Sequence, residues 1–251
     1  MEYSRYCLSP LFLVFGVISL WFVCLGLTIG LGHKTSAVFI SDTGTEHPER
    51  GIFTMTLNIG ASGIAATLIL NYRYVAQHGG PTRLNRATLI IGLLAALGLS
   101  MVGAFQWAEM FVAHVIGAAM AFLLSTAYTW LQTVLTYKLR DSGGTTMGTF
   151  GLRLFLAILV TGTLVPFVIT LALVFTKTAD TPDMRVATVT FEWLLGISQL
   201  IYPASLAWEL RKVTTVVIFL DIKGIIVKEA ARLRSTEMAP HFDVSSEAVY
   251  I

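Results

Sequence analysis

Six apolar stretches dominate this sequence, and each is long enough to cross a lipid bilayer as a helix, for which about 20 residues suffice. They cover approximately residues 8–31, 52–72, 87–105, 110–137, 152–175 and 189–208. Hydrophobic residues make up 55% of the chain and charged residues only 13%, against about 25% charged residues in a soluble domain. The sequence therefore predicts an all-α fold, a polytopic membrane protein in which residues 1–210 form a six-transmembrane-helix bundle.

The basic residues predict how this bundle is oriented in the membrane. Of the 17 Lys and Arg residues, only Lys34, Arg50, Lys177 and Arg185 fall on one side of the predicted bundle, and the others fall on the opposite side or in the tail. Cytosolic loops carry an excess of Lys and Arg. Both termini are therefore predicted to be cytosolic, and the loop between the first two spans is predicted to be luminal or extracellular.

That loop, Phe39 to Phe53, reads F-I-S-D-T-G-T-E-H-P-E-R-G-I-F and is the densest polar segment in the first half of the chain. Its D-T-G resembles the aspartic-protease motif, but the next span begins too soon for the β domain that such a protease needs. Asp and Thr side chains favour turns, and Pro favours the first turn of a helix. We expect a rigid lid that turns the chain back into the membrane and binds lipid or a partner. The candidate residues are Ser41, Asp42, Thr43, Gly44, Pro48 and Glu49.

Polar residues inside the apolar stretches form a second group of candidates, because burying them in lipid is costly. They are Asn58, His114, Gln132 and Glu192. His114 and Glu192 both fall near the outer ends of their spans, where Asp42 could join them in a polar cluster. Three interpretations stay open: interhelical hydrogen bonds that fix the packing, contact with lipid headgroups, and an ion or proton pathway.

The segment after the sixth span, residues 211–234, is basic and amphipathic, which is typical of a helix on the cytosolic membrane surface. Its basic residues predict contact with anionic lipid headgroups. They are Arg211, Lys212, Lys223, Lys228, Arg232 and Arg234. We expect residues 235–251 to form a mobile C-terminal tail.

Sequence motifs of metal-binding sites, nucleotide-binding sites and hydrolases are not recognisable in the sequence. It has no metal-ligand spacing, no phosphate-binding or dinucleotide fingerprint and no Ser-His-Asp order. We therefore predict no catalytic residue, no metal, no cofactor and no nucleic-acid partner.

Several stretches together resemble the DRAM/FRAG/SFK family of six-span membrane proteins, which includes the damage-regulated autophagy modulators. The loop motif is followed by L-N-I-G-A from Leu57, by N-Y-R-Y at 71–74 and by Glu192-Trp193 at the sixth span. Two departures are Phe39, where the family has Tyr, and His47, where Pro is common. The resemblance implies a non-enzymatic endolysosomal protein that regulates autophagy or membrane lipid organisation, with membrane lipids and a membrane or cytosolic protein as partners.

The same resemblance leaves two alternatives. Plasma-membrane relatives act as adaptors for a phosphatidylinositol 4-kinase or as accessory channel subunits, and the basic tail suits such a scaffold. More distant relatives remodel the lipid of GPI anchors, a reaction in which His114 and Glu192 would be the acid and base.

Overall fold

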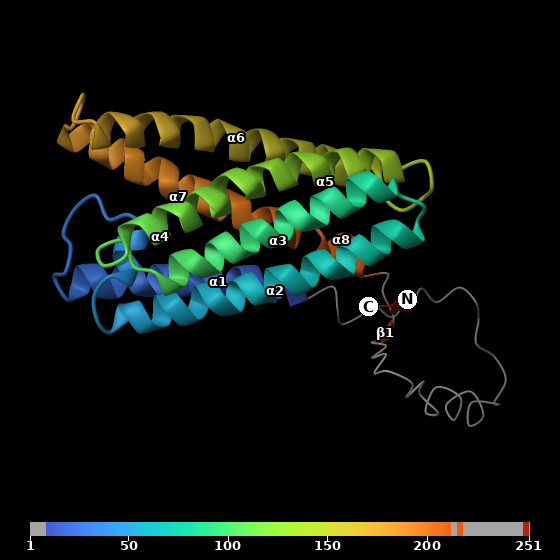
Figure 1. Ribbon diagram of the computed structural model, residues 1–251, viewed down its shortest axis with the longest axis horizontal. Helices are drawn as coiled ribbons and strands as arrows, with labels where there is room; N and C mark the ends of the chain where they lie inside the picture. The colour runs from blue at the N-terminus through green and yellow to red at the C-terminus, as the bar shows by residue number, and fades with distance from the viewer. Residues whose placement is uncertain (1–8, 212–214, 218–247, 251) are drawn as a thin grey trace, which may run out of the picture.

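The computed structural model describes residues 9–211, 215–217 and 248–250. Its long helices lie side by side in one elongated bundle (Figure 1). Their bounds are α1 Ser9–Gly30, α2 Glu49–Gln77, α3 Thr82–Ala104, α4 Phe111–Ala119, η3 Met120–Leu124, α5 Ser125–Leu139, α6 Met147–Phe175 and α7 Pro182–Ala204, with a short α8 at Ala207–Leu210. Because α4, η3 and α5 run on as one rod, the chain passes along the bundle six times.

Five of these passes are both long and apolar enough to cross a membrane: α1, α2, α3, the α4–η3–α5 rod and α6. The sixth pass, α7, has 23 residues and packs along α6, but it is more polar. Its buried face carries Thr188, Glu192 and Ser198. The predicted all-α membrane bundle is confirmed.

Helix capping and charge explain why three passes start before their apolar stretches do: a side chain caps α6 and α7, and an acidic residue begins α2. The Thr146 side chain accepts a hydrogen bond from the backbone N–H of Thr149, and this cap starts α6 at Met147 rather than at residue 152. Thr181 caps α7 in the same way, with Pro182 at the first helical position, so α7 starts seven residues before 189. Glu49 starts α2, where its negative charge favours the helix N-terminus.

Small residues allow a close contact between α3 and the fourth pass. A Cβ atom at Gly98 of α3 would lie 2.5 Å from the Cβ of Met120 and 2.6 Å from the backbone N of Ala121. A Cβ atom at Gly117 would lie 2.8 Å from the Cβ of Met101. The two backbones therefore approach each other at a place where only glycine fits.

The fourth pass contains a π-helical turn, η3, which the sequence analysis did not predict. Such a turn inserts one extra residue into an α-helix and leaves backbone groups free for other partners. Here the carbonyl oxygen of Phe122 accepts hydrogen bonds from Gln199 Nε2 at 2.9 Å and Thr126 Oγ1 at 2.7 Å. The π-turn thus ties the fourth pass to α7.

The C-terminal segments differ from the expectation where they are described. Thr215–Val217 (β1) is a strand, where the sequence suggested a surface helix, and it pairs in parallel with Ala248–Tyr250 (β2), part of the expected mobile tail. Arg211 stacks over the ring of Trp208, 3.5 Å from its centroid. The remaining basic candidates lie outside the described residues: Lys212, Lys223, Lys228, Arg232 and Arg234.

Candidate functional site

The D-T-G segment forms a 3-10 turn, η2 (Ser41–Gly44), which confirms the predicted turn. Asp42 Oδ2 accepts the backbone N–H of Phe39 at 3.0 Å, and Thr43 Oγ1 donates to the carbonyl of Ile40 at 2.6 Å. Gly44 packs against the Phe53 ring so closely that a Cβ atom would lie 2.3 Å from Phe53 Cδ1. Each residue type of the motif therefore has a local structural role.

The turn is inserted into the bundle and is not displayed on its surface. Asp42, Thr43 and Gly44 are buried, and so is Glu49. Ser41 is half-buried, and of the six loop candidates only Pro48 is exposed. The side chains of Asp42 and Glu49 are thus unavailable to an outside partner. We call the segment 41–49 the plug, because its buried residues fill the end of the bundle and do not project from it.

Both buried acids of the loop are paired with residues that directly follow α1. Lys34 Nζ lies 3.0 Å from Asp42 Oδ1, and His33 Nδ1 lies 2.5 Å from Glu49 Oε1. The second oxygen of Glu49, Oε2, has no hydrogen-bond partner among the described residues. The sequence analysis missed His33 and Lys34 because they lie outside the loop motif; their position just after the first span was the available signal.

Glu192 connects this plug to α7. Its Oε2 accepts the backbone N–H of Ile40 at 2.9 Å, and the neighbouring Trp193 Nε1 donates to the carbonyl of Val38 at 3.0 Å. Within the described residues, no Lys, Arg or His forms an ion pair with Glu192. A backbone amide and not a cation therefore holds this buried carboxylate.

His114 lies near this region of the bundle, in the first turn of α4. Its Nδ1 bonds the carbonyl oxygen of Phe105 at 2.7 Å, which positions the ring at the start of α4. His114, Ser41 and Glu192 all line one cavity of about 50 Å³. The structure thus brings His114 and Glu192 together beside the buried Asp42 turn.

The other two intramembrane candidates lie elsewhere. Asn58 donates to the carbonyl of Thr54 and accepts from Ser100 Oγ at 2.5 Å, which bridges α2 and α3. Gln132 is buried in α5, and its Oε1 has no partner among the described residues. Asn58 therefore serves interhelical packing, and Gln132 is separate from the cluster.

A second buried charge site lies at the opposite end of the bundle, where the sequence analysis treated Arg153 only as a positive-inside charge. Its guanidinium is fully buried and binds Glu209 of α8 through two bonds, Nη1 to Oε1 at 2.7 Å and Nη2 to Oε2 at 2.6 Å. It also donates to Thr136 Oγ1 at 2.7 Å and Ser205 Oγ at 3.1 Å. This site joins α5, α6 and α8.

An exposed ion pair borders the plug. Arg50 binds Glu109 through two bonds of 2.7 and 2.8 Å and also donates to Gln106 Oε1 at 2.8 Å. The hydrogen bond from Arg50 holds the pKa of the Glu109 carboxyl below its usual value. The pair joins α2 to the loop between α3 and α4.

The described contacts of the plug are structural, because they join helices and loop backbone to one another. Among the residues that the structure describes, no group of three or more His, Cys, Asp and Glu side chains could hold a metal ion. The polar atoms of the plug are mostly engaged with one another and with the backbone. Any ligand would have to reach the cavity between His114 and Glu192 or the exposed segments 32–36 and 46–48.

Comparison with known proteins identifies relatives over part of the chain. "DNA damage-regulated autophagy modulator protein 2" of Rattus norvegicus is 40% identical over 117 residues, which cover 45% of this chain and 44% of that protein. The human protein of the same name is 40% identical over 106 residues, 41% of this chain and 40% of its own length. "Modulator of macroautophagy TMEM150B" of Xenopus tropicalis is 38% identical over 106 residues, 42% and 46% of the two chains. The chain thus matches less than half the length of each.

No solved structure matches this chain. The sequence profile of the Frag1/DRAM/Sfk1/Cwh43P N-terminal domain matches residues 5–213, which include the six helical passes, the D-T-G plug and the Arg153–Glu209 pair. The chain therefore belongs to the Frag1/DRAM/Sfk1 family.

Proposed function

We propose that this chain is a non-enzymatic multi-pass protein of the endolysosomal membrane that modulates autophagy by binding membrane lipids or a protein partner. The observation that carries this proposal is the 40% identity to relatives whose names describe autophagy modulators. The acids of the buried D-T-G plug hold the helix ends together, which supports a structural role for the plug within such a protein. Family membership supports the membrane setting.

A depletion and rescue experiment tests this role. Cells that express the chain are depleted of it, and autophagic flux is followed as turnover of a lipidated autophagosome marker, with and without a lysosomal inhibitor. We expect depletion to change flux and the full chain to restore it. The matched rescue variants are Glu192→Ala, which removes the acceptor of the Ile40 amide, and Arg185→Ala, which removes only an exposed pair with Asp180. Unchanged flux after complete depletion would contradict the proposal.

Localisation of a tagged full chain tests the membrane assignment separately. We expect the signal to overlap with lysosomal and endosomal markers. A signal confined to the plasma membrane would contradict this and favour an adaptor for a phosphatidylinositol 4-kinase or an accessory channel subunit.

The non-enzymatic assignment has its own test, because His114 and Glu192 line one cavity. Surface display of GPI-anchored proteins and total lipid composition are measured in cells that carry His114→Ala or Glu192→Gln. We expect no change in either. Loss of display at normal protein level would assign lipid-modifying chemistry to this cavity.

The basic C-terminal segment is proposed to bind anionic headgroups, since it holds six Lys and Arg residues between 211 and 234. Purified full-length protein should show a higher melting temperature when anionic lipid is added to neutral micelles, and salt should reduce the shift. Replacing Arg232 and Arg234 by Gln should reduce the shift as well. A salt-independent shift would contradict electrostatic binding.

A further inference from the structure

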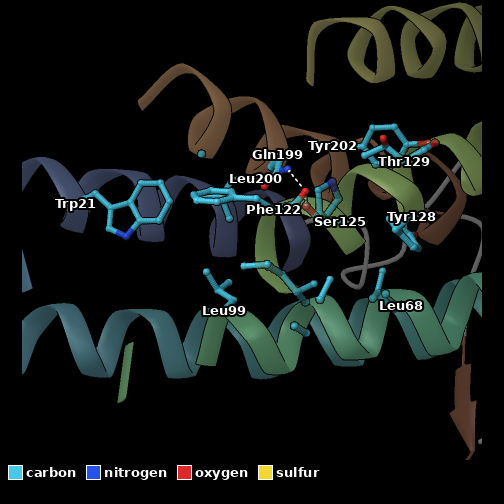
Figure 2. Close-up of a pocket in the computed structure, with 17 residues that line it drawn as sticks. Trp21, Leu68, Leu99, Phe122, Ser125, Tyr128, Thr129, Gln199, Leu200 and Tyr202 are labelled. Atoms are coloured by element: carbon cyan, nitrogen blue, oxygen red, sulfur yellow. Dashed lines mark hydrogen bonds between the residues drawn. The ribbon is translucent and has the colours of Figure 1, made fainter. Parts of the chain in front are cut away.

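A second cavity, of about 80 Å³, lies in the middle of the bundle (Figure 2). Its walls come from α1, α2, α3, the π-turn with α5, and α7, and α6 contributes no lining residue. Gln199 and the Phe122 carbonyl, joined by a hydrogen bond in Figure 2, form one wall. The extra residue of the π-turn therefore shapes this space.

The lining of this central cavity is almost entirely apolar. Leu68, Ala95, Ala96, Leu99 and Leu200 contribute hydrocarbon surface. Apolar cavities of this kind do not hold ordered water. The surrounding solvent in a membrane is itself hydrocarbon, and the cavity is partly open, so a hydrocarbon guest suits it.

The volume selects the shape of that guest. The volume of the central cavity is about half the volume of the ~150 Å³ cavity that accommodates benzene in a well-studied engineered protein. A fused-ring lipid is too wide for such a space, whereas a short length of an unbranched chain fits, with the rest of the chain extending through the opening.

Two hydrogen-bond donors on lining side chains indicate that the guest carries a hydrogen-bond acceptor. Tyr128 and Trp21 are both buried, and neither the Tyr128 hydroxyl nor the Trp21 Nε1 has a hydrogen-bond partner among the described residues. Buried donors are usually satisfied. A guest that carries an oxygen acceptor would provide the missing partner.

We propose that the central cavity binds one unbranched acyl chain of a lipid that carries an oxygen acceptor, either a free fatty acid or one chain of a phospholipid. The inference does not depend on a role in autophagy, because it rests only on the volume, lining and unpaired donors of the cavity. It also concerns a different place from the plug and from the basic C-terminal segment.

Photo-crosslinking of the full chain in neutral nanodiscs tests the proposal. Three probes carry a diazirine: a fatty acid, a phosphatidylcholine labelled in one acyl chain, and a sterol. We expect the fatty acid or the phosphatidylcholine to label lining residues such as Leu99 and Ser125, and whichever labels more strongly identifies the source of the chain. Preferential labelling of these residues by the sterol would overturn the assignment.

Cavity-filling variants provide the matched comparison. Ala96→Leu fills the cavity and should reduce labelling of the lining about tenfold, whereas Ala87→Leu on the exposed face of the same helix should leave it unchanged. If Ala96→Leu does not fold, the smaller Ala95→Val should reduce labelling about threefold. Equal labelling in the filled and control variants would overturn the proposal.

Tyr128→Phe tests the polar contact. It should reduce fatty-acid labelling about fivefold, the value of one hydrogen bond. In the absence of added lipid it should leave the melting temperature unchanged, since the hydroxyl has no protein partner to lose. A lowered melting temperature with unchanged labelling would overturn the assigned acceptor contact.

Discussion

Two buried carboxylates of the α7–α8 segment, Glu192 in α7 and Glu209 in α8, are held in different ways. Both oxygens of Glu209 bind the buried guanidinium of Arg153, so this negative charge has a positive partner. Glu192 receives a backbone N–H from Ile40 and has no cation beside it among the described residues. The comparison shows two ways of joining helices. The Arg153–Glu209 charge pair joins them at one end of the bundle, and towards the other end a backbone N–H of the loop around Ile40 binds Glu192.

The difference has energetic consequences. A buried charge pair makes a small net contribution to stability but is very sensitive to removal of one partner, because the remaining charge is left without compensation. A carboxylate held by a backbone donor loses less when it is replaced, since only a buried N–H is left without an acceptor, at a cost of about 1–3 kcal/mol.

Arg153→Met should produce the largest effect. It leaves Glu209 buried without a cation, and we expect a loss of about 3–5 kcal/mol in the free energy of unfolding, measured by denaturant titration in micelles. The exposed Arg185→Met should leave the free energy of unfolding almost unchanged, because its pair with Asp180 is screened by solvent. Combining Arg153→Met with Glu209→Leu should recover much of the loss, and no recovery would contradict the charge-pair explanation.

Glu192→Ala should have an intermediate effect. It removes the acceptor of the Ile40 amide, and we expect a loss of about 1–3 kcal/mol. Hydrogen exchange of the Ile40 amide should become faster, while amides near Arg153 keep their protection. Glu192→Gln retains an acceptor oxygen and should lose less; an equal loss would show that the negative charge is what the loop requires.

Lys34→Ala should have a smaller effect. The Lys34 side chain is 43% exposed and Asp42 keeps its bond from the Phe39 amide, so we expect a loss of about 0–1 kcal/mol that decreases with added salt. Thermal unfolding at two ionic strengths measures it. A loss as large as that of Arg153→Met would show that the Lys34–Asp42 ion pair stabilises the bundle as much as the Arg153–Glu209 pair does.

The smallest effect concerns pH. Arg50 lowers the pKa of the exposed Glu109 carboxyl, so this pair stabilises the folded protein above the ordinary carboxyl pKa. That contribution is lost as the pH falls through the lowered pKa. The melting temperature of the wild-type chain should therefore fall slightly more on acidification than that of Glu109→Gln, and parallel curves would contradict the pair.

Much of the fold follows from local sequence properties, whereas the partners of buried groups do not. Apolar length located all six passes. Thr181-Pro182 is a start signal for α7, whereas the apolar stretch alone predicts a start at residue 189. The pairing of Arg153 with Glu209 joins residues 56 apart, and it depends on helix rotation, which no local pattern reports.

The candidate site shows the same limit. Residue types predicted the turn at Asp42 and favoured a cluster with His114 and Glu192. Sequence patterns could not show that the turn faces inward, because burial of Asp42 depends on Lys34 and on the backbone around Ile40. Bringing residues 40 and 192 together requires the complete bundle.

The π-turn at Met120–Leu124 has a consequence for insertions and deletions. One residue of an α-helix corresponds to a rotation of about 100°. The wider π-turn accommodates its extra residue without that rotation, so deleting a single residue there should give a plain α-helix and keep the half that carries His114 nearly in phase with the half that carries Tyr128 and Gln132. The Phe122 carbonyl would then return to ordinary helical bonding and lose the hydrogen bond from Gln199. A one-residue deletion should therefore separate the fourth pass from α7 at this point while both halves of the pass keep their orientation.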